Sequence, residues 1–435
     1  MKTIVFIGAN KSGSSYEAIK ASEELHYYTV LLTDRKSFFD KRLDFPHVHS
    51  MRMCDLDNID ELKSAIACID SDRFTVEAIV SFIDPYCHTA ARLSRAFGLK
   101  AFTAEAIETM LDKTKSRAAL RDTPYAPPYQ VIDSEAEDTA RALDLPVVLK
   151  APVSSASRDV LVAATDRAYQ DAFGALRRRS PDGPVLVEQY LPGPQVLVET
   201  LTVDGVVHIA AVVRQEILFA GRFIVTGYQI VTDENSAFFR GLRDAAQSIV
   251  LAHGLRDGPC HLELRRSGGA WKLIEANPRI SGGAMNLLIE TAYGVNLAKE
   301  TLKAATGRRP ELGQRRRQEA FLQYVVVPEA GRLIKVTGRT MAQNSPGVRW
   351  VYVKPKKGSL LTPPASMGHR YAYVIATGGT AAEARRRAKA GAGCIQFHLR
   401  KTGGSQVPVE RIREVAGDHA EVGIGDFAGS VVWES

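Results

Sequence analysis

The stretch HLELRRSGGAWKLIEANPRISGG, residues 261–283, is the most informative part of this sequence. Two mostly apolar runs with alternating polar residues flank the turn signal Ser267-Gly268-Gly269, so the stretch predicts a β-hairpin. Glu263 lies on the first predicted strand and Glu275 on the second. Folding about the turn therefore brings the two carboxylates close to opposite each other.

Asn277 comes two residues after Glu275 and shares its strand face, because side chains alternate along a strand. Without a cation the two carboxylates would repel each other. Together with a carboxamide they form an oxygen ligand set suited to Mg²⁺. The pattern predicts a metal site of Glu263, Glu275 and Asn277, and the alternative is a solvent-exposed hairpin with ordinary surface charges.

Arg279 continues the spacing of two residues, and a guanidinium can hold a phosphate or carboxylate with two parallel hydrogen bonds. Gly282 and Gly283 follow, and the lack of side chains lets a ligand approach their backbone N–H groups. We interpret Arg279, Gly282 and Gly283 as the catalytic group of this segment.

The N-terminal third predicts an α/β domain with a parallel sheet covered on both faces. Strands alternate with helices there, and the expected elements are residues 3–7, 16–25, 28–32, 59–67, 78–82 and 88–97. The glycine turn 8–15 follows the first strand but lacks the G-x-G-x-x-G spacing, and Asp34 closes the second strand. A dinucleotide site and a purely structural turn both stay open.

The rest of the chain predicts antiparallel strands segregated from helices, an α+β pattern. Residues 195–201 and 206–213 alternate and flank Asp204-Gly205, a strong hairpin signal. At about 150 residues per domain, 435 residues suggest three domains. We expect an N-terminal domain, a central domain of two α+β subdomains, a C-terminal α+β domain and a tail of unknown role, at residues 1–108, 109–309, 310–400 and 401–435.

The composition, 45% hydrophobic and 24% charged, excludes wholesale disorder and a disulfide mini-protein. No apolar run approaches the roughly 20 residues that span a bilayer, so we expect a cytoplasmic chain without membrane contact. The net charge of +7 is modest, and we expect no nucleic-acid partner. The five cysteines form no C-x-x-C pair, which predicts neither a disulfide framework nor a zinc site.

At residues 263–283 the sequence resembles the ATP-grasp superfamily, most closely the carboxylate–amine ligases that include L-amino acid ligases. The most specific match is E-x-N-P-R-x-x-G-G with a Glu twelve residues earlier (275 − 263 = 12). Other matches are Lys113, Lys150, the phosphate-covering loop 154–158 and the adenine hinge 187–193. The resemblance implies that the N-terminal region is a pre-ATP-grasp domain and the central region the ATP-grasp domain.

The resemblance also implies roles for individual residues. The expected ATP-binding residues are Lys113, Lys150, Ser154, Ser155, Ser157, Glu188, Gln189, Tyr190, Leu191 and Gln195. Gln195 stands where an acid commonly holds the ribose, and Tyr228 replaces the histidine of a T-G-H element in the substrate pocket, which Arg279 also lines. Independently, a lysine that ends a buried strand, such as Lys150, must point at an anion or at water; a surface lysine is the alternative.

In such ligases ATP activates a carboxylate as an acyl phosphate, which an amine then attacks to give an amide, ADP and phosphate. The implied cofactors are ATP and Mg²⁺, with Mn²⁺ as an alternative metal. The implied partners are a small carboxylate and a small amine, most simply amino acids, and a homodimer stays open. The alternatives are biotin carboxylase-like or nucleotide-precursor chemistry on the same fold, a non-catalytic nucleotide-binding module and a nicotinamide-dependent dehydrogenase.

Overall fold

The structure is a computed structural model that describes residues 1–70, 73–133, 141–154, 159–219, 223–401 and 430–433. Its N-terminal region is a parallel sheet in the order β3-β2-β1-β4, as the alternation of strands and helices predicts. Its elements are β1 (Lys2–Ile7), α1 (Ser14–Glu24), β2 (Tyr28–Thr33), α2 (Lys36–Asp40), β3 (Ser50–Met53), α3 (Ile59–Ala67), β4 (Thr75–Val80) and α4 (Asp84–Ala96). Sequence reasoning missed β3, because Ser-Met-Arg-Met lacks a β-branched run.

Two helices lead to a small antiparallel sheet in the order β5-β8-β6-β7. The helices are α5 (Ala104–Leu111) and α6 (Lys113–Ala119). The sheet and its covering helix comprise β5 (Tyr129–Ile132), β6 (Val147–Lys150), β7 (Val160–Ala163), α7 (Asp166–Arg179) and β8 (Val185–Gln189). Tyr169 and Phe173 of α7 pack on Leu149 and Val187, which fixes the helix on one face of this sheet.

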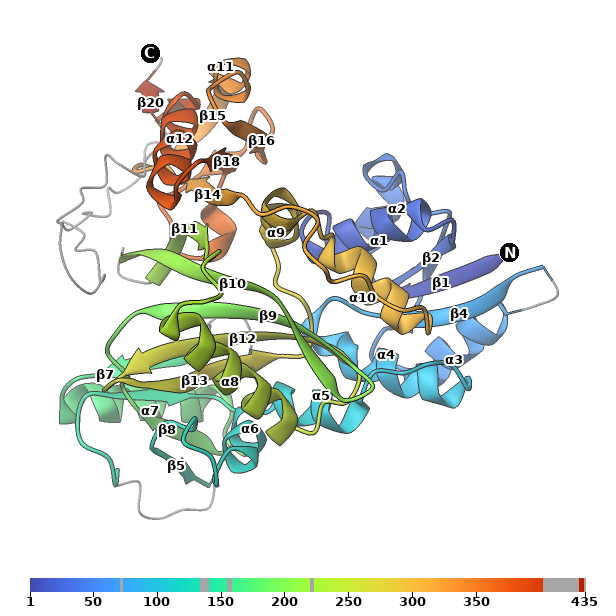
Figure 1. Cartoon of the computed structure of the whole chain (residues 1–435), viewed down its shortest axis with the longest axis horizontal. Helices are drawn as coiled ribbons and strands as arrows, with labels where there is room; N and C mark the ends of the chain where they lie inside the picture. Colours follow the sequence, from blue (N-terminus) through green and yellow to red (C-terminus); the bar gives the residue numbers. More distant parts are fainter. Residues whose placement is uncertain (71–72, 134–140, 155–158, 220–222, 402–429, 434–435) are drawn as a thin grey trace.

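An eight-stranded sheet in the order β13-β12-β9-β10-β11-β14-β18-β16 forms the centre of the molecule (Figure 1). Five strands come from the central region: β9 (Gln195–Val203), β10 (Val206–Phe219), β11 (Phe223–Ile230), β12 (Gly258–Ser267) and β13 (Ala270–Asn277). Both predicted hairpins are present. Asp204 and Gly205 have φ of 50° and 82°, and Gly268 and Gly269 have φ of 58° and 82°, the left-handed backbone that such two-residue turns require.

The last three strands of this sheet come from the C-terminal region: β14 (Glu319–Val325), β16 (Val348–Val353) and β18 (Ala372–Gly378). A second sheet, in the order β17-β15-β19-β20, completes that region together with its helices. These elements are β15 (Gly331–Thr337), α11 (Arg339–Gln343), β17 (Leu360–Leu361), α12 (Ala381–Gly393), β19 (Gln396–Arg400) and β20 (Ser430–Trp433). The C-terminal region thus continues the central sheet, and the exact domain limits stay a prediction.

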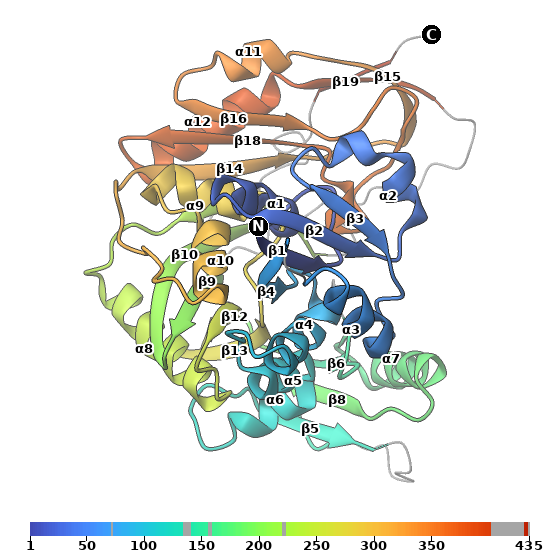
Figure 2. The same cartoon turned by 90° about the vertical axis from the view of Figure 1, so that its right-hand side faces the viewer.

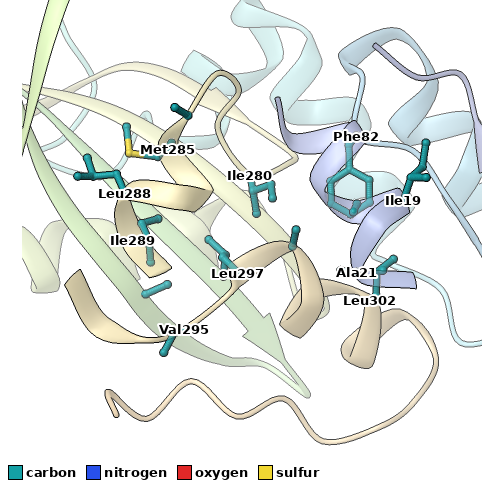
Figure 3. Close-up of a cluster of buried hydrophobic side chains, with 14 of the residues drawn as sticks. Ile19, Ala21, Phe82, Ile280, Met285, Leu288, Ile289, Val295, Leu297 and Leu302 are labelled. Carbon is teal, nitrogen blue, oxygen red and sulfur yellow. The ribbon is translucent and has the colours of Figure 1, made fainter. Parts of the chain in front are cut away.

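The two faces of the eight-stranded sheet have different covers. Helix α8 (Ala237–Ala252) packs its apolar side on one face. The other face meets α9 (Met285–Tyr293), α10 (Leu297–Ala305) and the N-terminal domain, whose Phe82 and Ile19 lie beside Leu302 of α10 (Figure 3). Figure 2 shows the N-terminal sheet in front of α9 and α10. Residues from distant parts of the chain therefore meet on this second face.

Among the described residues, no helix has the length and apolar character needed to cross a bilayer.

Candidate active site

The predicted carboxylate pair forms on neighbouring strands of the central sheet. Glu263 of β12 and Glu275 of β13 are register partners, as are His261 and Asn277. The Glu263 and Glu275 side chains are 25% and 31% exposed, so the pair is neither on open surface nor sealed in the core. Among the described residues no three His, Cys, Asp or Glu side chains gather as a metal site. Two carboxylates and the Asn277 amide suit a Mg²⁺ ion that takes its remaining oxygens from phosphates and water.

Two buried side chains, His261 and Glu199, form a series of contacts that leads away from Glu263. His261 Nδ1 lies 2.6 Å from Glu199 Oε1, and His261 Nε2 lies 3.6 Å from Glu263 Oε1. The second Glu199 oxygen accepts the Ser281 N–H at 3.1 Å. Sequence reasoning missed Glu199 and His261. Glu199 lies four residues after Gln195, and His261 lies two residues before Glu263, so each shares a strand face with a predicted site residue. The contacts among Glu263, His261, Glu199 and Ser281 therefore connect the carboxylate pair to the segment that follows Arg279.

The charge of His261 follows from these contacts. Burial lowers its pKa, but the Glu199 and Glu263 carboxylates outweigh burial and raise the pKa of His261 to about 10. Burial opposes ionisation of Glu263, yet His261 holds the pKa of that carboxyl below its usual range. Glu263 is therefore ionised at neutral pH, which a cation ligand requires.

We expect the stability of the protein to fall between about pH 6.5 and pH 10 partly through His261. A group whose pKa is higher in the folded than in the unfolded state stabilises the fold fully below its unfolded-state pKa. This stabilisation is lost as the pH rises through the folded-state pKa. Thermal unfolding midpoints at pH 7 and pH 9.5 will therefore differ less in His261→Gln than in the unchanged protein. The exposed His208→Gln serves as the control. Equal pH dependence in all three proteins would contradict the assignment.

Three buried cations lie next to the carboxylate pair. Lys113 Nζ lies 3.2 Å from Glu275 Oε1 and donates to the Ser154 carbonyl at 2.9 Å. Glu188 receives Arg117 Nε and Lys150 Nζ, each at 2.6 Å. Lys150 is buried, so the surface alternative for it is wrong. Lys113, Arg117 and Lys150 thus bring three positive charges to one place, and ammonium and guanidinium groups are donors that bind an anionic phosphate.

The pKa values of this group follow from burial and pairing. Burial is the main influence on Lys150 and lowers its pKa, although Glu188 opposes it. Burial also opposes the ionisation of Glu188, but Arg117 and Lys150 keep the pKa of that carboxyl below its usual range. Nothing in the sequence around Arg117 indicates Glu188 as its partner, since the two residues are 71 positions apart.

Lys150→Met will weaken ATP binding by about 1.5–3 kcal/mol, about 10- to 150-fold in Kd, which is the scale of a charge-assisted hydrogen bond. Methionine keeps most of the buried stem, and Glu188 retains Arg117, so we expect the fold to persist. Calorimetric titration with ATP measures the change. The exposed Lys357→Met is the control, and an unchanged affinity in Lys150→Met would remove this lysine from the phosphate site.

The hinge 189–191 presents free backbone groups. The Gln189 N–H donates to the Pro128 carbonyl at 2.9 Å and the Tyr190 N–H to the Pro146 carbonyl at 3.1 Å. Neighbouring strand residues usually exchange two hydrogen bonds, but proline has no N–H to donate. The Gln189 and Tyr190 carbonyls therefore accept no hydrogen bond from Pro128 and Pro146. Within the described residues, the Leu191 N–H also donates no hydrogen bond. One free donor and two free acceptors fit the edge of an adenine.

Gln195 connects the hinge to the carboxylate pair. Its Nε2 donates to Glu263 Oε2 at 2.8 Å, and its Oε1 accepts Arg265 Nη2 at 2.6 Å. Arg265 Nη1 donates in turn to the Leu191 carbonyl at 2.9 Å. Gln195 thus lies between the expected adenine and metal positions. The expected phosphate-loop residues Ser155 and Ser157 lie outside the described residues.

Arg279 pairs with the N-terminal domain. Strand β13 ends at Asn277, whose carbonyl accepts the Arg279 N–H at 2.8 Å, so Arg279 lies just past the strand rather than on it. Its Nε and Nη2 lie 2.6 and 2.7 Å from the two oxygens of Asp84, at the start of α4. One edge of the guanidinium is therefore occupied, and Nη1 also donates to the Ile280 carbonyl at 3.2 Å. Nη1 and Nη2 each retain one further hydrogen atom for a substrate carboxylate.

The two glycines after Arg279 differ in their surroundings. Gly282 is exposed, and a Cβ there would meet nothing within 4 Å. Gly283 has φ +66°, and a Cβ there would lie 2.7 Å from the Tyr324 hydroxyl. The N-terminal glycine turn contacts the same loop, because a Cβ on Gly13 would lie 3.1 Å from the Gly283 nitrogen. The turn packs on this loop.

Gly282→Ala tests ligand approach to this loop. The space around Gly282 is free of protein atoms, so we expect an unchanged unfolding midpoint. If substrate approaches the backbone here, the methyl group will lower turnover at least about 10-fold, the cost of displacing a close hydrogen-bond partner. The exposed Gly393→Ala, which also meets nothing, is the control. Normal turnover in Gly282→Ala would place the substrate elsewhere.

A row of tyrosines continues the site across the sheet. Tyr228 of β11 and Tyr324 of β14 have ring centres 6.0 Å apart, and Tyr324 and Tyr373 of β18 repeat that spacing. The strand registers place Tyr228 and Tyr324 on the same face as Glu263. Burial raises the pKa of Tyr228 to about 12, so its hydroxyl stays protonated. The predicted pocket residue Tyr228 thus lies on the face that carries the carboxylates.

Comparison with known families agrees with this geometry. A model of the ATP-grasp domain matches residues 143–286, and a model described as L-amino acid ligase C-terminal domain 2 matches residues 323–400. The chain belongs to the ATP-grasp superfamily. Within it, this ATP-grasp chain is an enzyme of the carboxylate–amine ligase group, which confirms the resemblance that residues 263–283 carry.

Individual relatives of this ATP-grasp ligase are distant. The uncharacterized protein y4rH of Sinorhizobium fredii is 26% identical over 86% of this chain and 78% of its own length. The L-arginine-specific L-amino acid ligase of Bacillus subtilis is 23% identical, and the match covers 54% of this chain and 59% of that ligase. A crystal structure of an L-amino acid ligase from Bacillus licheniformis superimposes with a TM-score of 0.77 at 18% identity, over 91% of this chain and 98% of that one. The expected fold class is confirmed.

Proposed function

We propose that this ATP-grasp ligase joins a small carboxylic acid to an amine, with amino acids as substrates, through an acyl phosphate. The observation that carries the proposal is the match of residues 323–400 to the L-amino acid ligase C-terminal domain. The ATP-grasp site by itself serves several chemistries, whereas this domain directs the choice toward amide formation. The position of β14 and β18 beside the site supports the choice, because that domain contributes Tyr324 and Tyr373 to the same sheet face.

The residues present fit ATP and Mg²⁺. Lys113 and Lys150 supply ammonium groups for the phosphates. Glu263, Glu275 and Asn277 would hold the metal ion. When bound, Mg²⁺ offsets charge on the phosphates. The Leu191 N–H and the Gln189 carbonyl would take the adenine edge.

The chemistry has two steps. A carboxylate oxygen of the acyl substrate forms a bond to the γ-phosphorus of ATP, and the bond to the leaving ADP breaks. The amine then attacks the carbonyl carbon, phosphate leaves, and the nitrogen loses a proton. Arg279 and the backbone N–H groups of Gly282 and Gly283 hold the carboxylate first and the tetrahedral oxyanion afterwards.

An ADP-release screen tests the proposal. Pairs of amino acids and small carboxylic acids are incubated with the protein, ATP and Mg²⁺, and mass spectrometry identifies the product. We expect ADP release that requires both substrates, with a product mass equal to their sum minus water. ADP release that depends on bicarbonate would instead support the biotin carboxylase-like chemistry and overturn amide formation.

A further inference from the structure

An arginine without a carboxylate partner lies beside the glycine loop of the site. Arg370 is half-buried, and its guanidinium carbon lies 3.8 Å from the centre of the Tyr324 ring. Its Nε donates to the Met367 carbonyl at 3.1 Å and its Nη1 to the Val225 carbonyl at 3.4 Å. Within the described part of the chain, no acidic side chain forms an ion pair with Arg370.

Two other arginines of the site, the buried Arg117 and the half-buried Arg279, are neutralised by carboxylates. Arg117 pairs with Glu188, and Arg279 pairs with Asp84. A partly desolvated cation without an anion is costly, so an unpaired arginine at such a place suggests a ligand that supplies the negative charge. The Arg370 guanidinium lies over the Tyr324 ring, and its planar fork can hold a carboxylate through two parallel hydrogen bonds.

The position of Arg370 ties it to the substrate rather than to ATP. Its Nη2 lies 3.8 Å from the place where a Cβ on Gly283 would stand, and the Tyr324 hydroxyl accepts the Ala284 N–H at 3.3 Å. Arg370 also reaches the strand of Tyr228, because its Nη1 donates to the Val225 carbonyl, and the ring centres of Tyr228 and Tyr324 lie 6.0 Å apart. The phosphate-facing cations, in contrast, are Lys113 and Lys150 on other elements.

We propose that Arg370 binds a second substrate carboxylate, one that is not activated by ATP. This assignment rests on the proposed ligase function and deepens it. Two substrates can supply such a group: an amino acid that acts as the amine and presents its α-carboxylate, or a dicarboxylic acid that acts as the acyl donor. In both cases Arg370 selects for charge at a point remote from the reacting atoms.

The test compares Arg370→Gln and Arg370→Lys with the unchanged protein and with Arg386→Gln, an exposed control on α12. ADP release is measured as kcat/KM for an amino-acid acceptor and its carboxamide, and for a dicarboxylic donor and its monoamide. We expect the unchanged protein to prefer one free acid over its amide by about 10- to 100-fold, the effect of one charge-assisted hydrogen bond. Arg370→Gln will lose that preference while its rate with the amide stays within about two-fold, and Arg370→Lys will keep part of it.

The substrate for which the preference disappears identifies the source of the carboxylate. Retention of every preference in Arg370→Gln would overturn the assignment, and so would an equal loss with acids and amides, since that result indicates a structural role. The unfolding midpoints of both variants separate misfolding from lost recognition. If the unchanged protein forms no amide from any pair, the ligase proposal fails first and the role of Arg370 falls with it.

Discussion

Glu275→Gln will lower ATP turnover by at least about 10²–10³-fold, the loss seen when one essential electrostatic contact to the reacting group is removed. Glu275 is the register partner of Glu263 and the ion-pair partner of Lys113. Glutamine has the same shape but no charge, so the metal ion loses an anionic ligand and Lys113 loses its only described carboxylate partner. We expect the fold to persist because Glu275 is partly exposed.

The measurement is ADP release at several Mg²⁺ concentrations, together with the thermal unfolding midpoint. Partial recovery at high Mg²⁺ would show that the variant binds the ion more weakly. The exposed Glu329→Gln removes one negative charge from a residue that contacts neither carboxylate of the pair in any described hydrogen bond or ion pair, and it is the control. Near-normal turnover at ordinary Mg²⁺ would show that the carboxylate pair is not the metal site.

Arg279→Lys will bind ATP nearly normally but lose about 10²–10³-fold in turnover, the scale of one lost oxyanion donor. The contacts of Arg279 in the structure explain this expectation. Arg279 uses one edge for Asp84, and its Nη1 and Nη2 each have one hydrogen atom left for a substrate carboxylate. Lysine keeps the charge but has no planar fork, so it cannot serve both partners with this geometry. Asp84→Asn will cost less, about 10-fold, because it loosens the guanidinium without removing it.

Calorimetry gives the ATP affinity of these variants, and phosphate release with the best substrate pair gives turnover. The exposed Arg309→Lys is the control. Normal turnover in Arg279→Lys would remove this residue from the carboxylate site. An ATP affinity that falls as steeply as turnover would move Arg279 to the triphosphate and leave the carboxylate unassigned.

The sequence by itself determined the local parts of the site. The glycine pair at 268–269 permits a two-residue turn, which sets Ser267 opposite Ala270, and a register shift between Glu263 and Leu264 then places Glu263 opposite Glu275. The strand 147–150 ends in Lys150 and is apolar up to that residue, which predicted a lysine directed at an anion or at water. These features depend on turn chemistry and on the period of two residues, and both act within a few residues of chain.

Only the tertiary structure decided which charged residues meet. Asp84 and Arg279 are 195 residues apart, and Arg117 and Glu188 are 71 apart. A basic run such as 385–387 is typical of a solvated helix face, yet Arg385 and Lys389 both pair with Glu216 of β10. No local pattern shows such partners, because ion pairing depends on which surfaces the packed helices and sheets bring together.

The C-terminal strands illustrate the same limit. The sequence predicted a C-terminal α+β domain, but the addition of its strands to the central sheet required the pairing of β11 with β14. That pairing brings Tyr324, and Arg370 stacked on it, to the Gly283 loop. Alternation along a strand determines on which face of the sheet a side chain lies. Which strand pairs with an edge strand depends instead on how much apolar surface the packed domains bury together. The sequence therefore predicted the proposed metal and phosphate groups, and packing between distant segments decided which residues surround the proposed substrate position.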